Sequence, residues 1–159
     1  MITKLCIVCL CMTASAMIGL AHMKNKKRRV SYFSSLVKLC DKLISEIAFR
    51  KENLNSILKE FASSDNTELS AHIAAFCDSP YSELKIRAPF LKADERKAVE
   101  DFFCSLGSTD SETQIFQLEN HKRRFNETYS DESEKFKKSG SMGLKLSVLL
   151  GIAAGILIL

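Results

Sequence analysis

Acidic residues are missing from both ends of this chain of 159 residues. All 19 Asp and Glu side chains lie in residues 30–138, where 16 Lys and Arg leave a net charge of −3. The other seven basic residues lie in or beside the two ends and bring the net charge of the chain to +4. A nucleic-acid-binding protein carries its positive charge on the folded domain. The partition therefore argues against nucleic acid as a partner.

A long stretch at each end also lacks charge. Residues 5–23 contain no Asp, Glu, Lys or Arg, and residues 146–159 are apolar or glycine except for Ser147. About 20 helical residues cross the hydrocarbon core of a membrane, which is about 30 Å thick. The second stretch reaches this length if it begins near Ser139 and the ammonium group of Lys145 extends to the headgroups. We therefore predict transmembrane helices over residues 1–23 and 139–159.

Basic residues beside these stretches predict the orientation of the chain. They form a basic collar that comprises Lys24, Lys26, Lys27, Arg28, Arg29, Lys135, Lys137 and Lys138. Positively charged segments stay on the cytoplasmic side of a membrane. The sequence thus predicts a two-pass cell-membrane protein whose central domain, residues 24–138, is cytoplasmic and whose termini lie outside.

A cleaved signal peptide is the alternative for the N-terminal stretch. Ala14, Ser15 and Ala16 are small residues after an apolar segment, as at a signal-peptidase site. However, the apolar character resumes in residues 17–20 and the basic collar follows at once, which opposes export. We favour an uncleaved span.

Small residues recur every four positions in both predicted spans. They are Cys11, Ser15 and Gly19 in the first span and Gly143, Ser147, Gly151 and Gly155 in the second. Small side chains let helix backbones approach closely inside a membrane. Glycine is also common in membrane helices in general, but the shared register favours a packing face. This face joins the two spans to each other or to a neighbouring protein.

Between the spans, the alternating pattern of a β-strand is absent, and apolar residues recur at helical spacing. The predicted helices cover residues 30–61, a shorter segment that ends before Pro80, residues 93–106, and residues 109–138. The first of them has a break near residues 50–53 with Asn53 as a cap, and the last can continue into the second span. Pro89 leaves residues 81–90 undecided. The predicted fold class is all-α, a helical bundle between two transmembrane helices.

Gly107 and the residues after it predict the end of one helix and the start of another. Glycine readily adopts the left-handed backbone that ends a helix. Thr109 and Glu112 have the spacing of a capping box, in which Thr109 is the cap.

Clusters of catalytic or metal-binding residues are missing as well. His72 has no close ligand pair with Cys40, Cys77 or Cys104, although zinc sites usually contain such pairs. No glycine-rich loop is present that could bind a nucleotide phosphate. The sequence therefore predicts no enzyme, no metal, no cofactor and no small-molecule substrate. In a cytoplasmic domain, we expect the three cysteines to be reduced and buried.

Three motifs carry a family resemblance. Residues 106–114, LGSTDSETQ, are similar to the pattern L-G-x-x-D-x-x-x-Q, and residues 43–54 to L-x-x-E-I-x-aromatic-x-x-x-x-L. Near the end, Gly143 and the Leu-Leu-Gly of residues 149–151 match a leucine-glycine step before an apolar run. With these motifs, and with the order of span, collar, domain and span, the chain resembles the stage III sporulation protein AB family. Lys145 and a short segment at residues 80–90 depart from that family's pattern.

The first motif gives structural roles to Leu106, Gly107, Asp110 and Gln114. Gly107 ends one helix, the charge of Asp110 favours the start of the next, and Gln114 can hydrogen-bond back to the loop. We interpret these residues as a stop-and-cap motif and not as an active site.

The resemblance also implies a function. It implies a part of the sporulation channel complex that links mother cell and forespore, with the domain in the mother-cell cytoplasm. It further implies a domain similar to the cytoplasmic domain of the type II secretion platform protein, in contact with other stage III sporulation channel proteins and a partner ATPase. A membrane-anchored adaptor or regulator unrelated to secretion is the alternative function, and a membrane-bound enzyme is a third.

Overall fold

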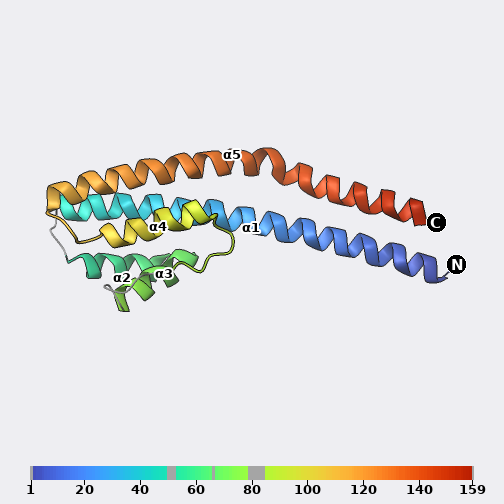
Figure 1. Ribbon diagram of the computed structural model, residues 1–159, viewed down its shortest axis with the longest axis horizontal. Coiled ribbons are helices and arrows are strands. Elements are labelled where there is room, and N and C mark those ends of the chain that lie inside the picture. The colour runs from blue at the N-terminus through green and yellow to red at the C-terminus, as the bar shows by residue number, and fades with distance from the viewer. Residues whose placement is uncertain (1, 50–52, 66, 79–84, 159) are drawn as a thin grey trace. The chain divides into compact units, whose positions relative to one another are not determined.

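The computed structural model describes the backbone of residues 2–49, 53–65, 67–78 and 85–158. Within these ranges it describes the side chains from residue 17 to residue 138, together with those of residues 13, 14, 149 and 153. All regular elements in these residues are helices, so the all-α prediction is confirmed (Figure 1). The helices are α1 (Ile2–Phe49), α2 (Leu54–Ser64), α3 (Glu68–Asp78), α4 (Ala93–Ser105) and α5 (Ser111–Ile158).

The chain forms two compact units. One consists of Met1–Lys27 and Asp131–Leu159, and the other of Arg28–Ser130. The second unit, which we call the helical domain, contains parts of α1 and α5 and all of α2, α3 and α4. Its ends lie a few residues inside the range 24–138 that the sequence suggested for the central domain.

Most side chains of the two predicted spans lie outside the described residues. Among the residues that the structure does describe, no helix has a segment of the length and apolarity needed to cross a membrane. Of the predicted packing face, only Gly19 is described, and it is partly exposed. The other members, which lie outside the described side chains, are Cys11, Ser15, Gly143, Ser147, Gly151 and Gly155.

The helix ends follow the local sequence. α1 ends at Phe49, and Asn53 caps α2 by accepting a hydrogen bond from the backbone N–H of Asn55 over 3.1 Å, so the predicted cap is confirmed. Residues 50–52 of the predicted break lie outside the described residues. The hydroxyl of Thr67 accepts the N–H of Leu69 at the start of α3. This helix ends at Asp78, before Pro80, as the sequence predicts.

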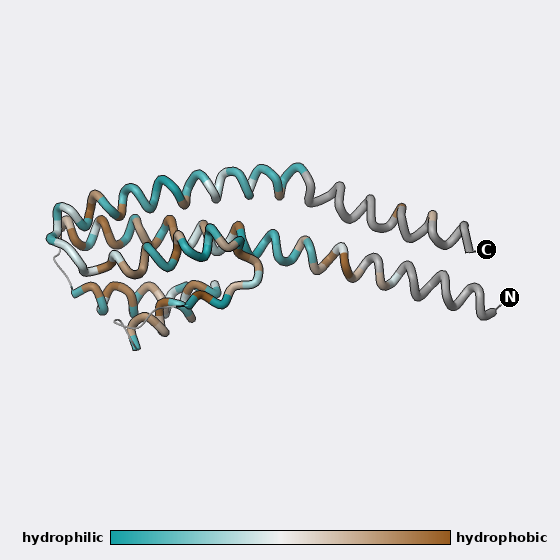
Figure 2. Tube along the Cα trace, in the orientation of Figure 1, coloured by the Kyte–Doolittle hydropathy of each residue, from teal (hydrophilic) through white to brown (hydrophobic). Residues whose placement is uncertain are grey.

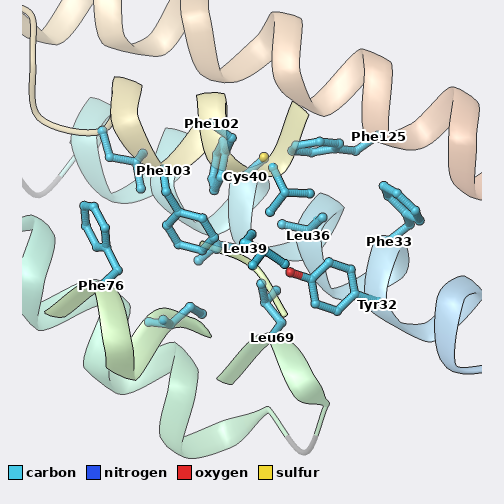
Figure 3. Packing of buried hydrophobic residues seen from close by; sticks show 14 of the residues in the cluster. Tyr32, Phe33, Leu36, Leu39, Cys40, Leu69, Phe76, Phe102, Phe103 and Phe125 are labelled. Atoms are coloured by element: carbon cyan, nitrogen blue, oxygen red, sulfur yellow. The ribbon is translucent and has the colours of Figure 1, made fainter. Parts of the chain in front are cut away.

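The core of the helical domain consists of apolar residues from all five helices and from residues 86–91; Figure 3 labels members from α1, α3, α4 and α5. Hydrophobic positions recur between hydrophilic ones along the parts of the helices that are coloured in Figure 2, as expected of helices with one apolar face. Phe102 of α4 is central, because its ring lies 5.2 Å from that of Phe103, 5.6 Å from that of Phe125 and 5.5 Å from that of His121. These edge-on contacts join α4 to α5 within a single cluster.

The cysteines differ from the expectation. Cys40 is buried, and burial raises the pKa of its thiol to about 12, so that it stays protonated. Cys77 is only partly buried and Cys104 is exposed, so the prediction that all three are buried was wrong. The apolar face of α4 includes Phe102 and Phe103, and Cys104 lies just past its edge.

A pair of phenylalanines tests this description of the core. Phe102 is fully buried, whereas 65% of Phe116 is exposed. We expect Phe102→Ala to lower the free energy of unfolding by about 3–5 kcal/mol and Phe116→Ala to change it by no more than about 0.5 kcal/mol. The chain has no Trp and its three Tyr all lie in residues 28–130, so tyrosine fluorescence during urea denaturation reports on the helical domain alone. Equal effects of the two substitutions would contradict the described core.

Candidate functional site

Two adjacent arginines at the start of the helical domain contact two different helices. Arg28 pairs with Glu68, the first residue of α3, and its guanidinium lies 5.1 Å from the ring centre of Phe90. Arg29 pairs with Glu95 in the first turn of α4. Neighbouring residues of a helix project about 100° apart, which allows the two side chains to diverge in this way. Together they tie α1 to the N-terminal ends of α3 and α4.

The two ion pairs differ in burial. The side chains of Arg29 and Glu95 are only 13% and 10% exposed, and the second carboxylate oxygen of Glu95 accepts the N–H of Lys92 over 3.0 Å. Arg28 and Glu68 are 40% and 41% exposed. Water screens the outer pair, whereas loss of one partner of the inner pair leaves a buried charge without compensation. The inner pair is therefore the stronger constraint on α1.

Two residues of the basic collar have partners within the helical domain. Arg28 and Arg29, which the sequence predicts to set membrane topology, pair in the structure with carboxylates of that domain. A basic run beside an apolar stretch cannot reveal which of its charges meet carboxylates 40 and 66 residues away.

The remaining collar residues lie on helix surfaces. Lys135 pairs with Glu132 over 3.3 Å and Lys138 with Glu134 over 2.5 Å, both along α5. Lys24, Lys27 and Lys137 are exposed, and Lys26 is partly exposed. The ammonium groups of these four lysines are therefore accessible to a negatively charged surface such as that of a membrane.

A small pocket lies beside the outer arginine. It has a volume of about 170 Å³ and is lined by Arg28, Ser31, Tyr32, Thr67, Glu68 and Phe90. The hydroxyl of Tyr32 lies 2.8 Å from Nδ1 of His72. Burial lowers the pKa of His72 and raises that of Tyr32, so that both groups are uncharged at neutral pH and share this hydrogen bond. The two rings also lie edge-on with their centres 5.6 Å apart, and this contact and the hydrogen bond hold α3 against α1.

A second pocket lies on another side of α1. It has a volume of about 90 Å³ and is lined by Phe33, Asp94, Glu95, Ala98, Arg124, Phe125 and Thr128. Nearby, the His121 ring stacks on Phe125 with centres 6.0 Å apart. Burial, and then the charge of Arg124, lower the pKa of His121. Its ring is therefore neutral at pH 7 and packs against the core residues Phe102 and Phe125.

The structure does not bring the candidate metal ligands together. Across the described part of the chain, no group of three His, Cys, Asp or Glu side chains is placed to bind a metal ion. His72 hydrogen-bonds to Tyr32, and Cys40 is buried elsewhere in the core.

The stop-and-cap motif forms a compact connection between α4 and α5. Leu106 is buried, and Gly107 has a φ of 74°, a left-handed conformation that side chains rarely adopt. The N–H of Gly107 donates to Oε1 of Gln114 over 2.9 Å, so the amide side chain holds the loop against α5. A Cβ at Gly107 would lie 3.4 Å from a methyl group of Leu54, which brings α2 to the same loop.

The cap of α5 is Asp110 and not Thr109. Oδ2 of Asp110 accepts the N–H of Thr113 over 3.2 Å, and the Asp110 carbonyl accepts the N–H of Gln114 over 2.8 Å. Hydrogen bonds from the side chain and then the backbone of Thr113 lower the pKa of the Asp110 carboxyl. The capping box predicted from Thr109 and Glu112 was therefore wrong by one position, because Asp is at least as good a cap as Thr.

The burial of the ion pairs generates one prediction. Arg29→Gln should lower the free energy of unfolding by about 3–5 kcal/mol, because Glu95 would remain buried and charged. Arg28→Gln should cost at most about 1 kcal/mol, because water screens its pair. Adding Glu95→Gln to Arg29→Gln should restore part of the loss. Urea denaturation followed by tyrosine fluorescence measures all three, and a larger loss for Arg28→Gln would contradict the described burial.

The two lowered histidine pKa values generate a second prediction. Above about pH 6.5 both rings are neutral in the folded and unfolded chain. Below that value the unfolded chain binds protons that the folded domain excludes, so the free energy of unfolding should fall as the pH falls. Urea midpoints at pH values between about 7.5 and 5.5 measure this. A His72→Gln/His121→Gln variant should show a flatter profile, and an equally steep one would assign the effect to other groups.

The chain was also compared with known proteins. A family model described as stage III sporulation protein AB matches residues 4–159. No curated protein and no solved structure gives a significant match.

Proposed function

The chain belongs to the stage III sporulation protein AB family, and on that premise we propose that it is a membrane-anchored structural component of the sporulation channel complex. The family relates it to stage III of sporulation. The observation that carries the proposal is the extent of the match, because residues 4–159 include both apolar ends and the whole helical domain. A single family model thus covers both apolar ends and the helical domain between them.

Membrane anchoring is the first part of the proposal. Residues 5–23 and 146–159 lack acidic residues, and only basic side chains flank them. On this basis the chain passes through the cell membrane twice, and its helical domain lies in the mother-cell cytoplasm. Small residues at Ser15, Gly19, Gly143, Gly151 and their neighbours at the same interval pack these spans against each other or against another channel protein.

A scaffold role is the second part. The histidines of the helical domain pack against aromatic rings, and its inner arginine is committed to an ion pair. These side chains stabilise the packing of the domain, as expected of a scaffold, which holds other proteins in position. We therefore propose that the domain resembles the cytoplasmic domain of the type II secretion platform protein and docks a partner ATPase and other stage III channel proteins.

Co-purification from sporulating cells tests the scaffold. The tagged full chain should bring down other stage III channel proteins from solubilised membranes, and deletion of its gene should arrest sporulation at stage III. Gly151→Leu should weaken the association, because a large side chain separates packed spans. Ala153→Leu is the matched control, because residue 153 lies on the opposite side of the same helix.

Two outcomes would contradict this function. Recovery of the intact chain without any channel protein would refute the scaffold. Normal sporulation after deletion, with expression in vegetative cells, would instead favour the membrane-anchored adaptor or regulator.

A further inference from the structure

Five basic side chains between residues 85 and 97 lack a carboxylate partner among the described residues. They form what we call the basic surface, which comprises Lys85, Arg87, Lys92, Arg96 and Lys97. Four of them are exposed and Arg96 is partly buried. Some other basic residues of the domain form ion pairs, such as Lys42 with Glu60 over 2.9 Å and Lys122 with Asp41 over 2.5 Å. The basic surface therefore keeps its positive charge available.

The fold brings these residues together. Residues 85–88 lie outside the helices, with Ile86 and Ala88 buried and Lys85 and Arg87 exposed to solvent. The N–H of Ile86 donates to Oε1 of Glu100 on α4 over 3.0 Å, which holds the segment beside that helix.

α4 supplies the other members of the basic surface. Lys92 immediately precedes α4, and Arg96 follows four residues later on the same side of the helix. Arg96 is also one turn before Glu100, so it lies on the side of α4 that faces residues 85–88.

Few carboxylates oppose this charge. Asp94 is the exposed acid within residues 85–97, whereas Glu95 is buried and neutralised by Arg29. Glu100 uses one oxygen for the backbone of Ile86, and Asp101 is exposed one position further along. Residues 30–138 carry a net charge of −3, so the positive charge of the basic surface is a local concentration on an acidic domain.

Contacts place the basic surface at one end of the helical domain. Phe90 lies against Arg28, and Glu95 pairs with Arg29. Both arginines are the first residues of the helical domain, and in the sequence they directly follow Lys24, Lys26 and Lys27. The basic surface is thus beside the point where α1 enters the domain.

We propose that the basic surface binds the anionic headgroups of the membrane that anchors the chain. The inference rests on the proposed two-pass anchoring. Anionic lipids of the cytoplasmic leaflet attract basic residues close to a membrane, and each Lys or Arg in contact strengthens the interaction roughly fivefold. The cations of the basic surface, near the first residues of the helical domain, have the charge and the position for such contact. It would fix the distance of the helical domain from the lipid and leave its remaining, acidic surface for other proteins.

Lysine reactivity in nanodiscs tests the proposal with the unaltered full chain. N-hydroxysuccinimide acetate, an uncharged reagent, acetylates lysines whose amines are free, and mass spectrometry reads each site. In phosphatidylglycerol-rich nanodiscs we expect Lys85, Lys92 and Lys97 to react about fivefold more slowly than in phosphatidylcholine nanodiscs. The difference should vanish in about 1 M salt, where the Debye length is about 3 Å. Lys38 and Lys59, exposed on α1 and α2, are internal controls whose rates should not change.

A matched pair of variants distinguishes direct contact between the basic surface and lipid from general proximity of the domain to the membrane. Arg87→Gln should reduce the protection of Lys85, whereas Arg123→Gln, which removes an exposed arginine on α5, should leave it intact. Equal rates in the two lipids would overturn the proposal. Protection that appears only in native membranes, and not in phosphatidylglycerol nanodiscs, would identify an acidic protein as the occupant and would also overturn it.

Carbonate extraction tests the membrane anchoring of the chain independently of the basic surface. A chain that alkaline carbonate releases from the bilayer would refute the proposed two-pass anchoring. A chain that resists extraction but shows no lipid-dependent change would refute the basic surface alone.

Discussion

Burial of one face of α1 is the constraint on which the helical domain depends. Leu36, Leu39 and Leu43 are completely buried along it. Side chains of α1 also contact each of the other four helices. Phe33 meets Phe125 of α5 with ring centres 6.1 Å apart. Removal of this face would leave no common partner for the apolar faces of the other helices, because a helix with an apolar face must bury it against another element.

Polar contacts refine the same arrangement. The hydroxyl of Ser35 donates to Asp65 after α2, and the phenol of Tyr32 reaches His72 of α3. On the surface, Lys42 forms an ion pair with Glu60 of α2, and Asp41 forms one with Lys122 of α5. Hydrogen bonds and exposed ion pairs each contribute little compared with apolar burial, but they select one register among those that the apolar faces allow.

Much of this could be predicted from the sequence, because helix periodicity and end signals are local. Asn53 and Gly107 marked helix boundaries from their own chemistry, and the structure uses both. The identity of the α5 cap was missed because Thr109 and Asp110 are both good caps, and only three-dimensional context decides between them. The ion pairs of Arg28 and Arg29 were invisible for a related reason. Their partners are distant in sequence, and the nearby apolar stretch offered a sufficient explanation of their charge.

The divergence of Arg28 and Arg29 has a mechanical consequence. If α1 turned about its axis by one residue, each guanidinium would move by about 100° and both ion pairs would be lost together. Sliding along the axis would likewise separate both from their carboxylates. A lone ion pair tolerates some rotation, because a long side chain can follow its partner, whereas two divergent ones cannot both follow. The pair of arginines therefore acts as a torsional lock that fixes the rotation of the domain's own part of α1 against α3 and α4.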